Sequence, residues 1–420
     1  MLDIKFIREN KELIKENCKN RRAKVNIDEF LELDEVRRDG LKKIENLRAE
    51  RNKKSKGKPS DEEIKKMREV GDMIKKLEEN QKTVEEKYLD ILQAIPNLSH
   101  PESPVGEETN YKVIFKNGEP PKFSFPPKTH DELMMNLDLI DFERGAKVTG
   151  TKFYFLKNDA VRLNQALINY GLDILEDHDF ILFETPDMAK NEILNASGFN
   201  PRGEESQIYE IKNNDLSLIG TAEITMLGFH ANEVIDLSKG PKKYAALSHC
   251  FRTEGGAYGK ANKGLYRVHQ FTKLEMFIFC KPEDSEKMHQ ELLVIEKKIC
   301  DGLDLPYRVI DIPTGDLGGP AYRKYDIEAW MTMIEDEGKK GGYGEITSAS
   351  NCADYQSRRL NIKYKKDDGS MELLHTLNGT AIVSSRFPVA LLENHQQKDG
   401  SIKIPKALKK YFGKKKISKP

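Results

Sequence analysis

A heptad pattern of apolar residues constrains this chain more than any other feature. From Met67 onward the pattern holds two series of apolar positions, the second three residues after the first, and only Gln81 interrupts it. A repeat of this kind predicts a long helix that buries one seam against a partner helix. The two series are Met67, Ile74 and Tyr88, and Val70, Leu77, Val84 and Ile91.

The partner helix is predicted in the segment just before this one, because a looser apolar seam runs there. Gly57 and Pro59 break the helix between the two segments, and Ser60-Asp-Glu-Glu63 provides a capping box for the second. Two long helices joined by a short turn are antiparallel neighbours. We therefore expect a helical hairpin over residues 28–94, about 50 Å long at about 1.5 Å per residue. The looser seam is Phe30, Leu33, Val36, Leu41, Ile44 and Leu47.

The tip of this hairpin is cationic, with no acidic residue before Asp61. A projecting arm with a cationic tip suits the phosphate backbone of a nucleic acid. A dimerising or scaffolding coiled coil is the alternative interpretation. The lysine-rich segment 403–419 is expected to be a solvated, partly disordered tail. The basic residues of the tip are Arg51, Lys53, Lys54, Lys56 and Lys58.

A change in sequence character near residue 105 predicts a domain boundary. Three prolines within residues 95–104 exclude a helix or a central strand there. The rest of the chain mixes strand-like runs, at 152–156 and 265–279, with helical segments near 160–177 and 283–302. The sequence therefore predicts an N-terminal helical domain, 1–104, and an α+β domain, 105–420, with a large antiparallel sheet.

Composition excludes several classes of protein. The chain has 69 Lys and Arg against 69 Asp and Glu, which argues against a uniformly basic nucleic-acid binder. No apolar run approaches the roughly 20 residues that span a bilayer, and the acid-containing N-terminus does not resemble a targeting signal. We expect a cytoplasmic protein without membrane contact. Its five cysteines are widely spaced, so neither a disulfide framework nor a zinc site is expected.

The stretch between Cys250 and Glu275 is the richest in chemistry. It parses as strand, glycine-rich loop and strand, and alternation along strands gives Arg252 and Glu254 one shared face. Arg267, Phe271 and Glu275 share a face of the second strand. Together they offer guanidinium groups for phosphates, a ring for a base, and carboxylates for amines or a metal. Simple ion pairing across two exposed strands is the alternative.

This stretch resembles the second signature motif of class II aminoacyl-tRNA synthetases. Its sequence is similar to that of the seryl-tRNA synthetase family in particular. Three further blocks agree in order: the TxE element Thr221-Ala-Glu223, the segment 343–352 with Glu345 and Ser348, and the third motif around Arg386. The helical arm also resembles that of the family. The resemblance covers essentially the whole chain and implies a catalytic domain on a large antiparallel sheet flanked by helices.

The resemblance implies an ATP-dependent ligase that forms seryl-adenylate and then charges the 3′-terminal adenosine of serine tRNA. Arg252 would bridge the α-phosphate and the serine carboxylate, and Arg267 and Arg386 would hold the distal phosphates. Phe271 would stack on adenine, covered on the other side by Arg386, while Glu254 would accept from the adenine amine. The ATP-binding set is completed by Thr253, Val268, Glu345 and Ser348.

The same resemblance implies how serine, metal and tRNA are bound. Thr221, Glu223 and Glu275, together with Arg252, would hold serine, and Thr380 would meet its hydroxyl. Glu345 and Ser348 would hold Mg²⁺ through ATP. Lys53, Lys54, Lys56 and Lys58 at the arm tip would bind tRNA. A homodimer is implied, with Pro186 at the position of the interface proline of the first motif.

The sequence departs from the family pattern at several positions, and three alternative functions are open at this point. Ala381, Ser385 and Pro388 replace residues common in the third motif, and Lys260 and Lys263 occupy a loop that often has an arginine. The rival enzymes are the prolyl and threonyl synthetases, which the arm argues against. A regulatory or RNA-binding relative without catalysis is a second rival, and a coiled-coil scaffold is a third.

Overall fold

The computed structural model describes residues 1–54, 60–198, 208–254, 264–336 and 338–419. It divides into two compact units, Met1–Leu98 and Ser99–Pro420. The division lies a few residues before the expected boundary near 105. Among the described residues, none of the helices is both long enough and apolar enough to cross a membrane.

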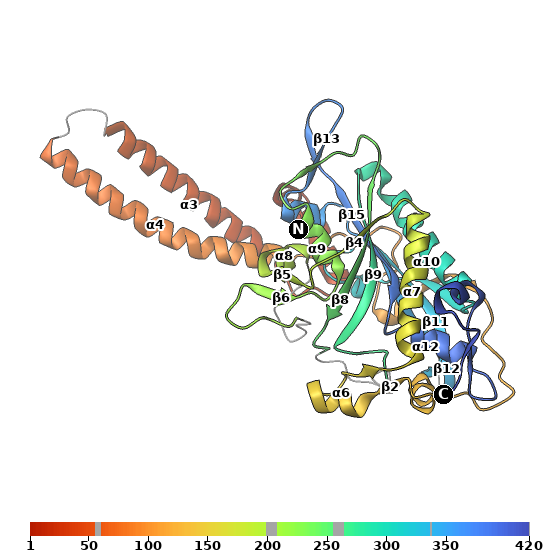
Figure 1. Cartoon of the computed structure of the whole chain (residues 1–420). Helices are drawn as coiled ribbons and strands as arrows, with labels where there is room; N and C mark the ends of the chain where they lie inside the picture. The colour runs from red at the N-terminus through yellow and green to blue at the C-terminus, as the bar shows by residue number, and fades with distance from the viewer. Residues whose placement is uncertain (55–59, 199–207, 255–263, 337, 420) are drawn as a thin grey trace. The chain divides into compact units, whose positions relative to one another are not determined.

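The first unit is helical, and its two long helices lie side by side (Figure 1). The ring of Phe30 stacks on that of Tyr88 at 5.3 Å between centroids, and Arg48 Nη2 lies 2.7 Å from Glu78 Oε1. The contact near the start of the first long helix is to the end of the second, and the contact further along the first helix is to an earlier residue of the second. The two helices therefore run antiparallel, and the predicted hairpin is confirmed. The helices are α1 Ile4–Glu9, α2 Lys11–Asn20, α3 Ile27–Lys54 and α4 Asp61–Ala94.

The predicted seam of α4 faces inward along its whole length. Every one of its apolar residues is buried or half-buried. Gln81, which interrupts the heptad, is half-buried and donates from Nε2 to the backbone oxygen of Arg37 at 3.1 Å. Gly40 leaves room for this side chain, because a Cβ there would lie 2.2 Å from Gln81 Oε1. The interruption is thus a polar cross-link between the two helices.

The predicted seam of α3 is wrong at two positions. Val36 is 56% exposed and Leu41 is 38% exposed, whereas the side chain of Asp34 is buried. Asp34 accepts hydrogen bonds from Arg8 at 2.7 and 2.9 Å and from Arg38 at 3.1 Å. These ion pairs turn α3 so that a carboxylate faces inward, which hydrophobic periodicity cannot predict.

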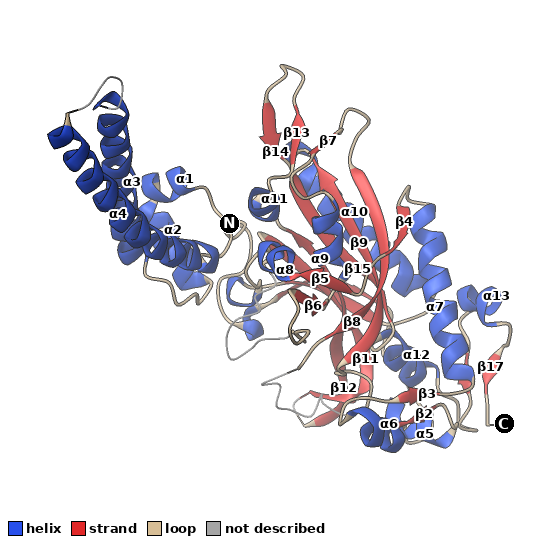
Figure 2. Ribbon diagram, turned by 60° about the vertical axis from the view of Figure 1, so that its left-hand side comes forward, coloured by secondary structure: helices blue, strands red, loops and turns tan. Residues whose placement is uncertain are grey.

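The second unit is built on an eight-stranded sheet (Figure 2). All neighbouring strands are antiparallel except β4 and β8, which are parallel. This confirms the predicted α+β class with a large, mostly antiparallel sheet. In sheet order the strands are β1 Lys112–Asn117, β10 Tyr307–Asp311, β11 Arg323–Asp336, β12 Lys339–Asn351, β15 His375–Val383, β9 Gln270–Cys280, β8 Lys242–Phe251 and β4 Ile181–Glu184.

Helices cover both faces of this sheet (Figure 2). The longer ones are α7 Asp159–Glu176, α10 Ser285–Gly302 and α12 Phe387–His395; the shorter ones are α5 His130–Asn136, α6 Phe142–Thr149, α8 Asn191–Ser197, α9 Ala222–Phe229, α11 Tyr355–Leu360 and α13 Lys409–Phe412. Small strands complete the unit: β2 Ile140–Asp141, β3 Phe155–Leu156, β5 Met188–Lys190, β6 Leu216–Leu218, β7 Val234–Ile235, β13 Lys363–Lys365, β14 Met371–Leu373, β16 Ile402–Lys403 and β17 Lys416–Ile417.

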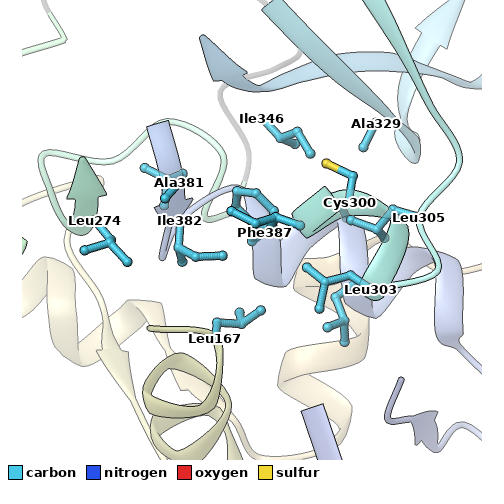
Figure 3. Close-up of a cluster of buried hydrophobic side chains, with 14 of the residues drawn as sticks. Leu167, Leu274, Cys300, Leu303, Leu305, Ala329, Ile346, Ala381, Ile382 and Phe387 are labelled. Atoms are coloured by element: carbon cyan, nitrogen blue, oxygen red, sulfur yellow. The ribbon is translucent and has the colours of Figure 1, made fainter. Parts of the chain in front are cut away.

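Alternation along β9 separates two environments. Leu274, Met276 and Ile278 are fully buried in the main core, which includes residues of α7, α10 and α12. Figure 3 shows part of this core, where Leu274, Ile382 and Phe387 lie around Leu167 of α7. Phe277 and Phe279 belong instead to a second cluster with residues of α9. The strand therefore has one core face, and its other face is free at one end for polar side chains.

Two predicted strands are shorter than expected, and the basic tail folds. The run 152–156 forms strand only at Phe155–Leu156, and the run 265–279 becomes strand only from Gln270. The segment 403–419 carries α13 and β17, with Phe412 and Ile417 buried, so the expectation of a solvated tail is wrong. Spaced apolar residues among the lysines anchor it.

Candidate active site

One polar cavity of about 460 Å³ lies against the face of β9 that carries Phe271, Lys273 and Glu275. It collects every residue predicted to bind serine, ATP or Mg²⁺ except Thr253. The lining residues are Thr221, Glu223, Arg252, Glu254, Tyr266, Arg267, Val268, Phe271, Lys273, Glu275, Glu345, Ile346, Ser348, Asn378, Thr380, Val383, Ser385 and Arg386.

Arg252 and Glu254 lie just beyond the end of β8, not on a strand face as predicted. The backbone of Phe251 donates to Ile219 at 2.8 Å, and Arg252 Nε donates to the oxygen of Gly220 at 3.3 Å. These bonds hold the segment that leads into Thr221 against the end of β8. The TxE element and the first arginine therefore reach one cavity from segments about thirty residues apart.

Strand β9 contributes Phe271, Lys273 and Glu275 at alternate positions. The guanidinium carbon of Arg252 lies 5.4 Å from the centroid of Phe271. Lys273 forms an ion pair with Glu275, and both side chains are buried. Thr380 of β15, which is predicted to meet the serine hydroxyl, is the ladder partner of Glu275, so these two predicted serine-binding residues are neighbours.

Strand β15 is irregular next to Thr380, where the pairing with β9 shifts by one residue before Ile382. The backbone N–H of Thr380 donates to Glu296 Oε1 of α10 at 3.2 Å. Burial raises the pKa of Glu296 well above its usual range. A fully buried carboxyl group thus supports the strand directly behind the cavity.

A bulge in β12 brings Glu345 and Ser348 to the same cavity. Their spacing of three residues would put them on opposite faces of a regular strand. The register with β11 skips Ile346, however, so β12 has one extra residue between them. Both side chains consequently line the cavity.

Arg386 stands at the N-cap of α12 and faces Glu345. Its Nη1 lies 2.6 Å from Glu345 Oε1, and its guanidinium carbon lies 5.3 Å from the centroid of Tyr266. The preceding segment is fixed by Ser384, whose N–H donates to Thr272 at 2.9 Å and whose hydroxyl accepts from the Thr272 N–H at 2.8 Å. Arg386 is therefore tied to β9 as well as to its own helix.

Opposite charges are balanced in pairs around the cavity. Besides the pairs already described, Arg267 Nη1 lies 3.5 Å from Glu254 Oε2. Burial favours the neutral form of Glu345, but Arg386 and Lys324 outweigh it and hold the pKa of this carboxyl below its usual range. Glu345 is accordingly a carboxylate at neutral pH.

Glu223 behaves differently from Glu345. Burial, with a second contribution from Glu275, raises the pKa of Glu223 to about 7. Gln356 Nε2, which is fully buried, donates to Glu223 Oε1 at 2.6 Å, and Gln356 Oε1 accepts from Thr376 at 2.6 Å. Thr221 caps α9 by accepting from the backbone N–H of Glu223 at 3.3 Å. The sequence carried no signal for Gln356.

Several cavity residues were missed by the sequence analysis. Tyr266 donates its hydroxyl to the backbone oxygen of Glu345 at 2.9 Å, and Asn378, Ser385 and Val383 also line the wall. Tyr266 directly precedes Arg267, so its position beside that arginine was the available signal. Lys53 is an exposed residue at the end of α3, whereas Lys56 and Lys58 lie outside the described residues, and so do Lys260 and Lys263.

The donor set of the cavity fits a magnesium ion held mainly by its nucleotide. Glu345 and Ser348 offer a carboxylate and a hydroxyl, which are the oxygen ligands that Mg²⁺ prefers. Among the described residues there is no group of three or more His, Cys, Asp or Glu side chains arranged to hold a metal ion. Two protein oxygens suit a metal ion whose coordination shell is completed by phosphate oxygens and water.

Comparison with known proteins agrees with this geometry. The family profile "tRNA synthetase class II core domain (G, H, P, S and T)" matches residues 208–395, which contain the cavity, and "Seryl-tRNA synthetase N-terminal domain" matches residues 1–99. The fold and the cavity thus define a class II aminoacyl-tRNA synthetase core.

Relatives that match over their full length identify the family within this class. A serine–tRNA ligase of Treponema denticola is 53% identical over 98% of this chain and 99% of the relative, and one of Rubrobacter xylanophilus is 49% identical over 99% of both. The seryl-tRNA synthetase of Pyrococcus horikoshii, solved with ATP, superposes with a TM-score of 0.89 at 40% identity and covers both chains fully. The chain belongs to the seryl-tRNA synthetase family.

The raised pKa of Glu223 predicts a gain in stability when this carboxyl is replaced by an amide. A group with a raised folded-state pKa stabilises the fold below its unfolded pKa, about 4.3, and this contribution is lost as the pH rises through about 7. Glu223→Gln keeps an acceptor for Gln356 and does not ionise. Relative to wild type it should gain about 2 kcal/mol in free energy of unfolding between pH 5 and pH 8.

Urea unfolding can be followed by fluorescence of Trp330, the single tryptophan of the chain, which lies in β11 of the same unit. Glu210→Gln, at an exposed glutamate, is the matched control and should show no pH-dependent difference. A difference for Glu223→Gln that stays flat from pH 5 to pH 8 would contradict the raised pKa.

Proposed function

We propose that this protein is a serine–tRNA ligase that activates L-serine with ATP and transfers it to the 3′-terminal adenosine of serine tRNA. One observation carries the proposal: a single cavity unites a carboxylate-rich end, formed by Glu223 and Glu275 near Thr380, with an arginine-rich end, formed by Arg252, Arg267 and Arg386. An amino acid and a nucleoside triphosphate need these two kinds of surface side by side.

The serine end of the cavity suits an ammonium group and a hydroxyl. The carboxylates of Glu223 and Glu275 and the hydroxyl of Thr221 would accept from the α-ammonium, and Thr380 would meet the side-chain hydroxyl. A site that hydrogen-bonds a hydroxyl rejects an analogue without it, because its buried polar groups are then left unpaired. Alanine and glycine would be rejected in this way, and threonine by size.

The nucleotide end suits adenine and three phosphates. Phe271 would stack on the base, with Thr253 and Val268 beside it and Glu254 accepting from the amine. Arg267 and Arg386 would hold the distal phosphates, and Arg386 would also cover adenine from the other side. To do so, Arg386 would leave Glu345, which with Ser348 would then hold Mg²⁺ on ATP.

The chemistry needs positioning and charge neutralisation rather than a protein nucleophile. The serine carboxylate attacks the α-phosphorus, the bond to pyrophosphate breaks, and pyrophosphate leaves with the electron pair. Arg252 would hold both reacting groups, the carboxylate and the α-phosphate, while charge develops between them. The terminal tRNA hydroxyl then attacks the seryl carbonyl, and AMP leaves. Bound Mg²⁺ would supply neutralisation of phosphate charge.

Serine-dependent exchange of pyrophosphate into ATP tests the first step. The purified protein is offered serine, threonine, alanine, glycine and proline separately, without tRNA, and exchange should occur with serine alone. Arg252→Ala should lower kcat/KM at least a thousandfold, because one guanidinium neutralises both reacting groups. Arg144→Ala, at an exposed arginine of α6, is the control. Exchange with proline or threonine, or none with any of the five, would contradict the proposal.

Binding of tRNA for the transfer step is assigned to the helical arm. Lysines at the arm tip would bind tRNA phosphates, and each bound phosphate adds to the salt dependence of binding. Replacing the four lysines by alanine should raise the KM for tRNA at least tenfold and reduce the salt slope by about one for each phosphate that is no longer bound, while pyrophosphate exchange stays unchanged. The four positions are Lys53, Lys54, Lys56 and Lys58.

The control for this variant is a set of four exposed lysines in the C-terminal segment, replaced in the same way. It should leave tRNA charging within twofold of wild type. Equal losses in the two variants would show that general positive charge, not the arm tip, attracts the tRNA. The control positions are Lys403, Lys406, Lys409 and Lys415.

A homodimer is the assembly that the surface supports best. The edge strand β4 exposes Ile181 and Leu182 and leads to Pro186, the residue that the motif resemblance places at the interface. Such an apolar edge strand is a site for pairing with another chain. The mass in solution should be twice 48.1 kDa, and a monomeric mass at micromolar concentration with full charging activity would contradict this assembly.

A further inference from the structure

A polar bridge is buried beside the nucleotide end of the cavity, outside its lining. His130 at the start of α5 and Glu393 in α12 are both fully buried. Glu393 Oε1 accepts from the backbone N–H of His130 at 2.7 Å and lies 2.8 Å from His130 Nδ1. Glu393 Oε2 accepts from the backbone N–H of Met333 in β11 at 3.0 Å. One carboxylate therefore joins α5, α12 and β11.

The other side of the imidazole ring holds the chain that enters the site. The backbone N–H of Leu265 donates to His130 Nε2 at 3.0 Å. A backbone amide can only donate, so Nε2 is the acceptor and the ring carries its proton on Nδ1, toward Glu393. The tautomer of His130 is thus fixed by its two partners.

Gly264 passes close against the same ring. Its φ is +67°, and a Cβ built there would lie 1.9 Å from His130 Nε2. A side chain at this position would be strained by the backbone and would also displace the ring. The chain is therefore held tightly at Gly264 and Leu265, directly before Tyr266 and Arg267 enter the cavity.

The bridge also reaches the second arginine of the nucleotide end. Arg386 is the N-cap of α12, and Glu393 lies about two helical turns further along the same helix. Arg267 follows Leu265 by two residues. The two arginines thus stand on segments that the His130–Glu393 bridge joins across the core.

We propose that His130 and Glu393 are positioning residues for ATP, which fix the segment Leu265–Arg267 relative to α12 and thereby set the spacing of Arg267 and Arg386. This inference rests on the proposed function, because it assigns ATP to the arginine-rich end. The pair does not touch the nucleotide. Its effect is transmitted through the Leu265 amide on one side and through α12 on the other.

Two substitutions of His130 separate the two halves of the bridge. His130→Asn places an amide where Nδ1 stands, so it keeps a donor for Glu393 and loses the acceptor for Leu265. His130→Gln places its amide oxygen near the position of Nε2, so it keeps the acceptor for Leu265 and loses the donor for Glu393. Both remove one buried hydrogen bond, and a purely stabilising role would make their effects on ATP alike.

The readouts are the equilibrium affinity for ATP with Mg²⁺, measured by calorimetry without serine, the KM for serine in pyrophosphate exchange, and the melting temperature. His130→Asn should weaken ATP binding at least tenfold and leave the KM for serine within twofold. His130→Gln should weaken ATP binding less than threefold, because the backbone N–H of residue 130 still joins Glu393 and the acceptor for Leu265 is kept, although its melting temperature also falls. His395→Asn is the control. His395 is another largely buried histidine, at the end of α12, and its Nε2 is hydrogen-bonded to the backbone oxygen of Leu303; the substitution should not change ATP affinity.

Equal ATP affinities for wild type, His130→Asn and His130→Gln would overturn the proposal and leave the bridge a stabilising element only. Parallel losses of ATP and serine affinity would also overturn it. If His130→Asn does not fold, Gly264→Ala decides in the same way, with a tenfold loss of ATP affinity expected and an unchanged affinity contradicting the inference. A wild-type protein that binds no ATP would instead refute the proposed function.

Discussion

The register of strand β9 is the constraint on which the rest of the catalytic unit depends. Leu274, Met276 and Ile278 are fully buried in the main core, and a shift of one residue would bring Lys273 and Glu275 into that core. The same alternation turns Phe271, Lys273 and Glu275 toward the cavity. Burial of apolar side chains on one face therefore fixes, before any ligand binds, where the aromatic ring and the charges of the other face stand. The neighbouring strands β8 and β15 take their positions from this ladder.

Irregular backbone then completes what regular strands cannot provide. The bulge at Ile346 brings Glu345 and Ser348 to one cavity, and the shift beside Thr380 is supported by the buried carboxyl of Glu296. Charges in the cavity are paired, as Arg386 with Glu345 and Lys273 with Glu275, which limits the cost of holding them in a partly buried site. Burial raises the pKa of Glu223 to about 7, so the charge of this cavity carboxyl is poorly supported by its surroundings, and a substrate ammonium would supply a partner for it.

The sequence predicted the parts of this molecule that local pattern controls and missed those that distant residues control. The heptad of α4 was predicted correctly, because hydrophobic period determines which face of a helix is buried. Val36 was placed wrongly because Arg8, far away in the chain, draws Asp34 inward. Motif resemblance predicted 12 of the 18 residues that line the cavity, although strand alternation alone would have separated Glu345 from Ser348. The His130–Glu393 bridge was not predicted, because its two residues are 263 positions apart and His130 lies outside every recognised motif, although Glu393 lies in the third.

A crystal structure with a non-hydrolysable seryl-adenylate analogue would test whether one cavity holds serine at its carboxylate end and ATP at its arginine end. We expect the analogue's ammonium against Glu223 and Glu275, its hydroxyl at Thr380, its phosphate mimic at Arg252, and its adenine on Phe271. An analogue bound in the reverse orientation, or outside this cavity while pyrophosphate exchange proceeds normally, would contradict this arrangement.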